Sequence, residues 1–435
     1  MRSDGYGFRS IPGSEQSVQG GPDPLEGRRI LVGICGSIAA VKLPLVVSAL
    51  AKRGADVRCV LTSSAAQLVS PVALASLSRN RCYLDADQWL HTAARPLHIE
   101  LAEWAELVLL APLSATSLGR WVHGLADTLL SSVLLACEAP VLAAAAMNTS
   151  MWASGPVQHN WRQLHGFGQV LPLGPTPGVL ACDRQGDGRM AEPALLLLGL
   201  ETLQLWGCQR DWQGRRLLVS AGPTREPLDP ARCITNASSG LMGVLLAQAA
   251  RLRGAEVDLV HGPLAVEPAL LEGLRCHSAP TAAAMQQALA DLQPQADAIA
   301  MAAAVADHRR ARPALHKAAK DEVSMLLTSG WEPVPDLLAE LVQRRNQRRD
   351  PWPQPILGFA AQSGDVLAAA MAKLARKGCD LLFANPIDRP GSGFSVSLNQ
   401  GWLLAPGAEP VWLDPAHKLA IAHRLLSALG PLVQR

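Results

Sequence analysis

The sequence predicts an α/β protein with two doubly wound domains, and two observations support this fold class. Residues 28–57 and residues 215–257 follow one pattern: two arginines, an apolar run, a Gly-containing loop, an amphipathic run, and Arg-Gly-Ala followed by an acid and valine. This order is typical of a strand, a helix and the next parallel strand. At 435 residues the chain is also long enough for two or three domains.

The expected domain boundary follows a leucine-rich run, residues 195–205, that is typical of a closing helix. The predicted organisation is a disordered tail at 1–26, a first domain at 27–205, a short polar linker at 206–214 and a second domain at 215–435. The tail is rich in Gly, Ser and Pro and lacks the apolar core of a signal peptide.

Composition excludes several classes of protein. The net charge of +2 gives no reason to expect nucleic acid or an anionic membrane as a partner. The longest uncharged run, residues 139–161, contains Pro, Asn and His, whose polar groups a bilayer would leave unsatisfied. The nine cysteines form no CxxC pair or zinc spacing, which suits a reducing compartment. We therefore expect a cytoplasmic protein that binds neither nucleic acid nor membranes.

The loop between the first strand and helix of the second domain, residues 220–240, carries special chemistry. The two similar segments start 187 residues apart and end 200 residues apart, so the second contains 13 additional residues in this loop. The loop holds small and hydroxylated residues, Arg225, Arg232 and Asn236. A strand, such a loop and a helix N-terminus together can hold phosphates through backbone N–H groups.

In Rossmann-like sheets, ligands bind beyond the carboxyl ends of the strands. In the first domain, four loops should meet there and carry Gly33, Gly36 and Ser37; Thr62 and Ser63; Ser114 and Thr116; Met147 and Asn148. In the second domain, a strand predicted at 298–305 leads to Asp307, and another at 381–384 leads to Asn385. Four of the seven lysines, Lys317, Lys320, Lys373 and Lys377, lie in one stretch; they are either scattered on solvated helices or grouped at a polyphosphate site.

Five segments of the first half carry motifs: residues 33–42, 98–105, 111–130, 147–152 and 181–190. Together they resemble the motifs of the bifunctional flavoprotein family of coenzyme A biosynthesis, in which phosphopantothenoylcysteine decarboxylase is fused to phosphopantothenate–cysteine ligase. Residues 33–42 resemble the flavin-phosphate loop, and 98–105 resemble the segment of the catalytic histidine, here His98. Residues 111–130 resemble the flavin-binding strand end and following helix. Residues 147–152 resemble the substrate-binding Met-Asn motif, with Ala145 in place of a usual proline. Residues 181–190 resemble the flap with catalytic Cys182, and Asp183 replaces a usual glycine.

The second half resembles the ligase of the same family. Residues 222–230 and 234–240 match the ligase loop, 302–307 match the strand with a nucleotide- or cation-contacting acid, and 317–320 keep two of the family's lysines. Residues 358–363 resemble a nucleotide-binding turn, and 373–385 match the following helix and strand. Residues 393–399 retain part of a late Gly-Phe segment.

The resemblance implies that the first domain has the fold of the homo-oligomeric flavin-containing Cys decarboxylases. It also implies FMN, CTP and Mg²⁺ as ligands. FMN would accept electrons so that the cysteine carboxylate can leave; CTP would activate phosphopantothenate as an acyl-cytidylate that cysteine attacks. The resemblance also implies trimer-based decarboxylase assembly and ligase dimers. The expected catalytic residues are His98, Asn148, Cys182, Asn236 and Lys317. The expected cofactor contacts are Gly36, Ser37, Thr62 and Ser114 for flavin, and Asp307 (also the metal ligand), Lys317, Phe359, Phe383, Lys373 and Lys377 for the nucleotide.

Two other functions fit parts of the sequence. Some relatives of the first half resemble regulatory flavoproteins that bind protein partners, although His98 and Cys182 argue for catalysis. Alternatively, the decarboxylase works and the ligase half has lost activity, because Leu241 replaces a usual basic residue, Gln362 replaces a usual glutamate and residues 393–399 are altered. CTP-dependent pyrophosphate release distinguishes these hypotheses.

Overall fold

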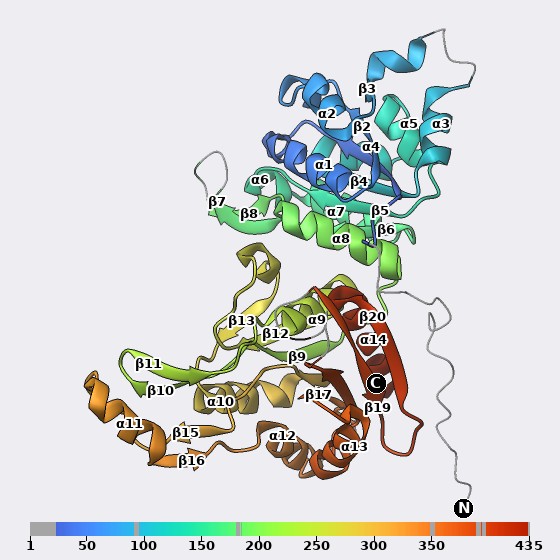
Figure 1. The fold of residues 1–435 in the computed structure, drawn as a ribbon. Helices are drawn as coiled ribbons and strands as arrows, with labels where there is room; N and C mark the ends of the chain where they lie inside the picture. Colours follow the sequence, from blue (N-terminus) through green and yellow to red (C-terminus); the bar gives the residue numbers. More distant parts are fainter. Residues whose placement is uncertain are drawn as a thin grey trace, which may run out of the picture. The chain divides into compact units, whose positions relative to one another are not determined.

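The computed structural model describes residues 23–90, 95–179, 183, 185–348, 353–388, 393 and 397–433. These residues form two compact units that divide between Arg210 and Asp211 (Figure 1). The described part of the chain contains no helix that is long and apolar enough to cross a bilayer.

The first unit is built on a six-stranded sheet in the order β3-β2-β1-β4-β5-β6, with every neighbouring pair parallel. The strands are β1 Arg29–Ile34, β2 Asp56–Leu61, β3 Cys82–Leu84, β4 Leu107–Leu113, β5 Val141–Ala145 and β6 Val170–Leu173. This strand order is that of a doubly wound dinucleotide-binding fold, in which the order reverses between β1 and β4. The first half of the fold-class prediction is therefore confirmed.

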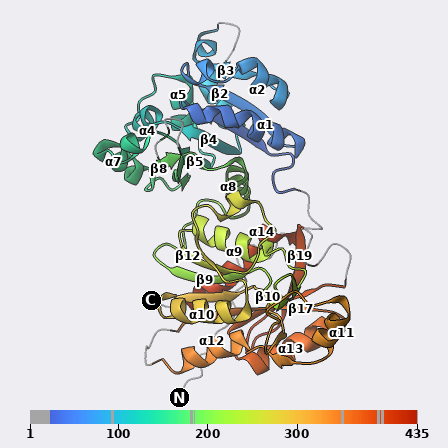
Figure 2. The same ribbon diagram turned by 90° about the vertical axis from the view of Figure 1, so that its left-hand side faces the viewer.

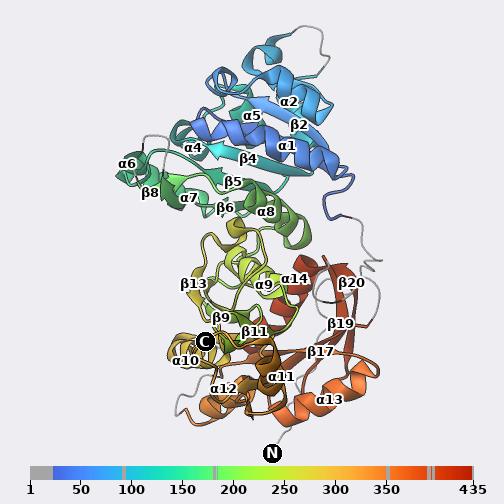
Figure 3. The ribbon, with the colours of Figure 1, turned by 60° about the vertical axis from the view of Figure 1, so that its left-hand side comes forward.

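Helices cover both faces of this sheet because successive βαβ crossovers are right-handed and leave the sheet on alternate sides. Helices α3 Leu97–Trp104, α4 Ala115–Val122, α5 Leu129–Ala136 and α7 Gly155–Leu164 share one buried core with the strands. Helices α1 Leu43–Lys52, α2 Pro71–Ser78 and α8 Pro193–Trp206 pack on the sheet, and α1 and α8 lie along the same side of it (Figure 3). The short helix α6 Thr149–Trp152 follows β5, and β7 Thr176–Val179 and β8 Gln185–Arg189 form a separate antiparallel pair.

The second unit repeats this design with two added strands. Its sheet has the order β13-β12-β9-β14-β17-β18-β19-β20, and only the last two pairings are antiparallel. The strands are β9 Arg216–Ala221, β12 Glu256–His261, β13 Arg275–Ser278, β14 Ala298–Met301, β17 Ile356–Gln362, β18 Leu381–Pro386, β19 Leu398–Leu404 and β20 Val411–His417. The second half of the fold-class prediction is confirmed as well.

One core of the second unit lies between the sheet and helices α10 Ala282–Leu292, α12 Leu337–Asn346 and α13 Val366–Lys377. Helices α9 Leu241–Leu252 and α14 Lys418–Leu429 pack against each other. Helices α9 and α10 lie on opposite sides of β9 and β12 (Figure 2). Both faces of the sheet are therefore covered, which explains why its strands read as continuous apolar runs.

Two features of the second unit correct the sequence-based expectations. The segment 220–240 is not an irregular loop, because β10 Arg225–Asp229 and β11 Arg232–Thr235 form an antiparallel hairpin within it. The strand predicted at 298–305 ends at Met301, since the next residues bond the hairpin base instead of the sheet: Ala304 N donates to Gly222 O, and Thr224 N donates to Ala304 O. A second pair, β15 His308–Arg310 and β16 Trp331–Pro333, lies near β10 together with helix α11 Lys320–Thr328 (Figure 1).

Candidate functional site

The loops after β1, β4 and β5 surround a cavity of about 510 Å³ in the first unit. Six residues that the sequence placed at strand ends line it: Gly36, Ser37, Ser114, Thr116, Met147 and Asn148. They meet because the carboxyl ends of parallel strands share one edge, and the cavity lies beside the β1/β4 reversal of strand order. Apolar side chains complete the lining: Ile38, Val41, Met151, Val179 and Met190.

Helix caps orient two of these polar residues. Asn148 Oδ1 accepts a hydrogen bond from Ser150 N at 2.9 Å and caps α6. Ser114 Oγ accepts one from Ser117 N at 3.3 Å and caps α4. Met147 N also donates to Gly188 O at 3.0 Å, which ties the end of β5 to β8. The polar rim of the cavity is thus held by the main chain.

Gly36 lies where the loops after β1 and β2 approach each other closely. In the structure, a Cβ on Gly36 would lie 2.4 Å from Ser64 Cβ in the loop after β2. The glycine is required because two strand-end loops pack against each other at this point.

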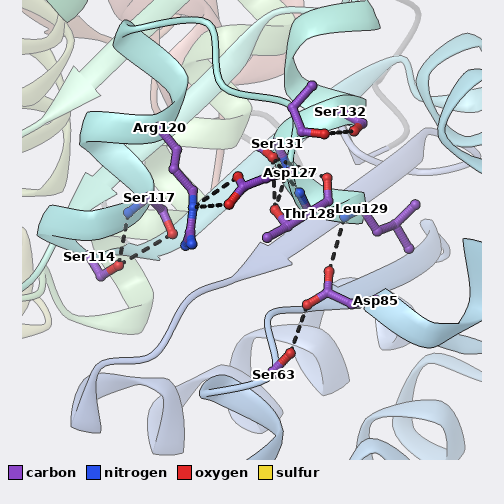
Figure 4. A network of polar contacts seen from close by, with 11 residues as sticks. Ser63, Asp85, Ser114, Ser117, Arg120, Asp127, Thr128, Leu129, Ser131 and Ser132 are labelled. Atoms are coloured by element: carbon purple, nitrogen blue, oxygen red, sulfur yellow. Dashed lines mark hydrogen bonds and ion pairs between the residues drawn. The ribbon is translucent and has the colours of Figure 1, made fainter.

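Thr62 and Ser63 do not line the cavity. Thr62 Oγ1 accepts from Ala65 N at 3.3 Å, and Ser63 Oγ donates to Asp85 Oδ2 at 2.8 Å. Asp85 Oδ1 in turn accepts from Leu129 N at 3.0 Å, so this carboxylate links the loop after β2 to the start of α5 (Figure 4). Asp85 was not among the predicted residues, although it directly follows β3 and polar residues at strand ends are the expected site candidates.

The predicted catalytic residues of the decarboxylase do not all meet within one chain. His98, the second residue of α3, lines a separate hollow of about 620 Å³ with Trp89, Asp127 and Leu135. Asn148 lines the 510 Å³ cavity instead. Cys182 lies outside the described residues. Its neighbour Asp183 has a φ of 59°, a left-handed conformation that favours glycine and that Asp tolerates better than most residues.

A cluster of charged residues at the cavity was also absent from the predicted site. Lys42 and Arg189 line it, and both bind the Glu192 carboxylate: Lys42 Nζ lies 2.7 and 2.8 Å from its two oxygens, and Arg189 Nη1 lies 2.8 Å from Oε1. Lys42 ends the motif at 33–42, so its place in the sequence was known, but its partner lies 150 residues away.

In the second unit, a hollow of about 240 Å³ lies at the base of the β10–β11 hairpin. It is lined by Pro223, Arg225, Thr235, Asn236, Ala237, Ser238, Pro263, Leu264 and Ala265. Asn236 Nδ2 donates to Ala304 O at 3.0 Å and to Val305 O at 3.3 Å. The two amide hydrogens of Asn236 thus bind the main chain that leads to Asp307.

Lys317 and Asp307 are both exposed and do not line this hollow. The segment with Lys317 contacts the hairpin near its turn, whereas Asn236 lies at its base. Within the described ranges, no group of three or more His, Cys, Asp or Glu side chains could hold a metal ion. A single carboxylate at Asp307 suits a cation that takes its other oxygen ligands from water and phosphate, as Mg²⁺ commonly does.

The four remaining candidates, around β17, β18 and α13, have structural partners. Phe383 is fully buried, and its ring makes an edge contact with the half-buried Phe359 at 5.8 Å between centroids. Lys373 Nζ donates to Phe359 O at 3.2 Å, and burial, with Lys377 nearby, lowers the pKa of Lys373. Lys377 pairs with Asp336, the N-cap residue of α12. Of these four residues, Phe383 is placed in the core instead of at a surface that a nucleotide could reach.

Comparisons with known proteins match both units. The flavoprotein family matches residues 21–199, and the family of the DNA/pantothenate metabolism flavoprotein C-terminal domain matches residues 212–432. The chain is 33% identical over 410 residues to the coenzyme A biosynthesis bifunctional protein CoaBC of Bacillus subtilis, covering 94% of this chain and 98% of that protein. Its identity to the CoaBC protein of Mycolicibacterium smegmatis is 37% over 418 residues, with the same coverage. For the Escherichia coli K12 protein it is 37% over 383 residues, covering 86% and 90%.

Two solved structures are similar to parts of the chain. The FMN binding protein AtHal3 is 32% identical, with a TM-score of 0.38, and the match covers 42% of this chain and 99% of that one. The C-terminal domain of a CoaBC protein is 30% identical, with a TM-score of 0.42, and the match covers 52% and 98%.

The two doubly wound units, each with a hollow at a strand-end edge, define a two-domain α/β enzyme whose first unit is a flavoprotein. The chain belongs to the family of bifunctional proteins of coenzyme A biosynthesis. The predicted pair of activities, phosphopantothenoylcysteine decarboxylase and phosphopantothenate–cysteine ligase, is confirmed at the level of this family.

Proposed function

We propose that the first unit decarboxylates phosphopantothenoylcysteine with FMN bound in the 510 Å³ cavity, and that the second unit makes this substrate from phosphopantothenate, cysteine and CTP. The observation that carries the proposal is the cavity itself, because three strand-end loops bring Ser37, Ser114 and Asn148 together there. The cytoplasm remains our predicted location.

The lining fits a flavin mononucleotide. Ile38, Val41 and Met151 offer apolar surface to a planar ring, and Ser37 and Lys42 offer a hydroxyl and a positive charge to a phosphate. When bound, FMN supplies the electron acceptor that a cysteine carboxylate needs before it can be lost. Asn148, which lines the same cavity, would hold the substrate carboxylate or amide. Cys182 would donate the last proton to the product.

His98 would act as the base of the first stage from a neighbouring subunit, since within one chain it lines a different hollow from Asn148. Exposed apolar side chains line both hollows: Ile38 and Val41 are 55% and 53% exposed at the cavity, and Trp89 is 79% exposed in the hollow of His98. Two unlike surfaces that pair head to tail form a closed ring, such as a trimer, when the rotation between neighbouring subunits closes. This supports the trimer-based assembly.

In the ligase reaction, a carboxylate oxygen of phosphopantothenate attacks the α-phosphorus of CTP and pyrophosphate leaves. The cysteine nitrogen then attacks the acyl carbon, loses a proton and displaces CMP. Lys317 would neutralise charge that develops at the α-phosphate, and Asp307 would share Mg²⁺ with the phosphates. Asn236 would orient the acyl-cytidylate through its Oδ1, because its amide hydrogens bind Ala304 O and Val305 O.

A second copy of the ligase unit would cover helix α11. None of its nine residues is buried, and Met325 and Leu327 in the helix and the preceding Leu315 are 70%, 51% and 86% exposed. An apolar helix face in this setting is typical of a protein–protein contact. It supports the predicted ligase dimer.

One assay tests the proposed function. The purified protein is incubated with phosphopantothenate, cysteine, CTP, Mg²⁺ and FMN, and phosphopantetheine is measured. We expect product only when CTP is present, and accumulation of phosphopantothenoylcysteine when His98 is replaced by Asn. Pyrophosphate release without phosphopantothenoylcysteine, or no release at all, would contradict the ligase assignment, whereas failure to decarboxylate supplied phosphopantothenoylcysteine would contradict that of the first unit.

A further inference from the structure

Strand β10 carries two buried acids that the reaction does not use directly. Glu226 and Asp229 are each only 3% exposed. Glu226 Oε1 accepts from Ala282 N at 2.8 Å, at the start of α10. Asp229 faces a different element, the segment between β15 and α11 that contains Lys317. The two acids therefore fix the hairpin to two separate parts of the unit.

The Asp229 carboxylate accepts three main-chain hydrogen bonds. Oδ1 accepts from Ala231 N and Arg232 N, both at 2.8 Å, and these bonds close the hairpin turn. Oδ2 accepts from Ala318 N at 3.2 Å and lies 3.3 Å from Arg232 Nη1. One oxygen thus shapes the turn, and the other holds the residue after Lys317.

Ala318 is the fixed point of its segment. Between residues 311 and 320 it is the buried residue, Ala314 is half-buried, and the other residues, Lys317 included, are exposed. Arg232 Nη2 donates to Ala318 O at 3.3 Å, and Ala314 N donates to Leu228 O at 2.9 Å. Three described contacts with the hairpin therefore position the main chain on both sides of Lys317.

A carboxylate suits this position because it only accepts hydrogen bonds and faces only donors. Burial raises the pKa of the Asp229 carboxyl, but the N–H groups of Ala231, Ala318 and Arg232 and the Arg232 charge outweigh burial and hold that pKa below its ordinary value. Asp229 is therefore ionised at neutral pH, the condition under which we expect the ligase to act.

We propose that Asp229 is a positioning residue of the ligase, whose carboxylate holds the Ala318 amide so that Lys317 is presented at a fixed place on the hairpin that carries Asn236. The inference rests on the proposed role of Lys317 at the α-phosphate. A displacement of about 1 Å at a reacting group can cost about 10²-fold in rate. Loss of the Asp229–Ala318 bond should therefore slow acyl-cytidylate formation without removing the lysine.

Asp229→Asn tests this contact in the full-length protein. The amide oxygen can still accept from Ala231 N and Arg232 N, but the NH₂ group then faces the Ala318 N–H. We expect kcat for pyrophosphate release to fall about 10- to 100-fold while KM for CTP changes less than about 3-fold, the pattern of an interaction made in the transition state.

The matched control is Glu226→Gln, a buried acid-to-amide change on the same strand, which should leave kcat within about 3-fold of wild type because Oε1 can still accept from Ala282 N. An equal fall in kcat for Asp229→Asn and Glu226→Gln would overturn the inference. So would a higher KM for CTP with unchanged kcat in Asp229→Asn.

A double variant separates this inference from the proposed function. Lys317→Met alone should slow pyrophosphate release, and adding Asp229→Asn should slow it little further, because the two residues act as one unit. If Lys317→Met has wild-type activity, the proposed role of Lys317 is wrong. If it is slow but Asp229→Asn adds its full loss, Lys317 keeps its role and the positioning inference is wrong.

Asp229→Ser tests the same contact if the Asp229→Asn protein does not fold. A hydroxyl can accept from the turn N–H groups but is too short to reach Ala318 N. We expect the same loss of kcat, together with faster hydrogen exchange at the Ala318 amide measured by mass spectrometry. Unchanged exchange and unchanged kcat in a folded Asp229→Ser protein would contradict the inference.

Discussion

Lys42 and Glu192 form a bidentate ion pair at the 510 Å³ cavity of the first unit, with Lys42 Nζ 2.7 and 2.8 Å from the carboxylate oxygens. Their side chains are 33% and 25% exposed, and Arg189 binds the same carboxylate. Glu192 therefore joins the loop after β1 to the end of β8, and it balances two positive charges beside the cavity.

We expect Glu192→Gln to lower the free energy of unfolding of the first unit by about 1 kcal/mol. The effect is small because water screens the Coulomb attraction of a partly exposed ion pair. Decarboxylation should slow because β8 is less firmly held, while ligation is unchanged. Thermal release of flavin, followed by fluorescence, measures the first effect. Glu103→Gln, which removes a pair with Arg95 that is 58% and 59% exposed, is the control and should shift the release temperature less.

Gly36→Ala should reduce flavin occupancy. The new Cβ would lie 2.4 Å from Ser64 Cβ, so the loops after β1 and β2 must separate, at a cost of about 1–3 kcal/mol for overpacking. The wild-type protein should be yellow with stoichiometric FMN, and the variant paler at equal concentration. Gly155→Ala, where an added Cβ meets nothing within 4 Å, is the control. Full flavin content in Gly36→Ala would show that this close approach does not shape the flavin site.

Cys182→Ser should leave flavin bound and block the last protonation. A hydroxyl is a far weaker acid than a thiol, so an oxidised enethiol-type intermediate should accumulate and phosphopantetheine should not form. Mass spectrometry of the products measures both. Asp183→Gly is the companion variant: it should retain activity, because the φ of 59° at this position favours glycine. Product formation by Cys182→Ser at the wild-type rate would make Cys182 a structural residue.

Asn236→Asp should separate the two steps of ligation. The substitution places a carboxylate oxygen where Nδ2 now donates to Ala304 O and Val305 O, and it adds a negative charge near the acyl-cytidylate phosphate. Pyrophosphate release should survive for a single turnover, while transfer to cysteine falls by roughly 10²-fold, because a carboxylate repelled by Ala304 O and Val305 O no longer holds Oδ1 in place against the acyl-cytidylate. Quenched-flow analysis of pyrophosphate and CMP distinguishes the steps. Decarboxylation of supplied phosphopantothenoylcysteine should be unaffected, and equal loss of both ligase steps would move Asn236 to a role in CTP binding.

The pair of Lys377 and Asp336 should make the second unit sensitive to acid. Burial raises the pKa of Asp336, but its hydrogen bond from Lys377, the Ala339 N–H and nearby positive charge outweigh burial and hold that pKa below its ordinary value. Because the pKa is lower in the folded state, the stabilisation is present above the unfolded value of about 3.9 and is lost as pH falls through the folded value. The difference in Tm between wild type and Asp336→Asn should thus be constant from about pH 6 to 8 and shrink below about pH 4. A difference that grows in acid would show that the pair is not what stabilises this region.

Local patterns in the sequence determined the two doubly wound sheets. They also determined which residues gather at the carboxyl-end edge of each sheet. The repeated Arg-Arg, apolar, Gly-loop and Arg-Gly-Ala pattern marks βαβ units, and right-handed crossovers leave few ways to order parallel strands. Since all parallel strands end at the same edge, Ser37, Ser114 and Asn148 could be placed together from their positions after strands alone. The resemblance to a known family then connected that edge to flavin chemistry.

Only the tertiary structure decided which side chains meet across long separations in the chain. Lys42 binds Glu192 across a sequence separation of 150 residues, and Asp229 binds Ala318 across a separation of 89 residues. The packing of whole elements brings these partners within hydrogen-bonding distance. Tertiary packing also buried Phe383 in the core and placed His98 and Asn148 in different hollows of one chain. Local patterns report which face of a strand or helix is apolar, but the partner of a polar side chain depends on how distant elements pack, and no local pattern contains that information.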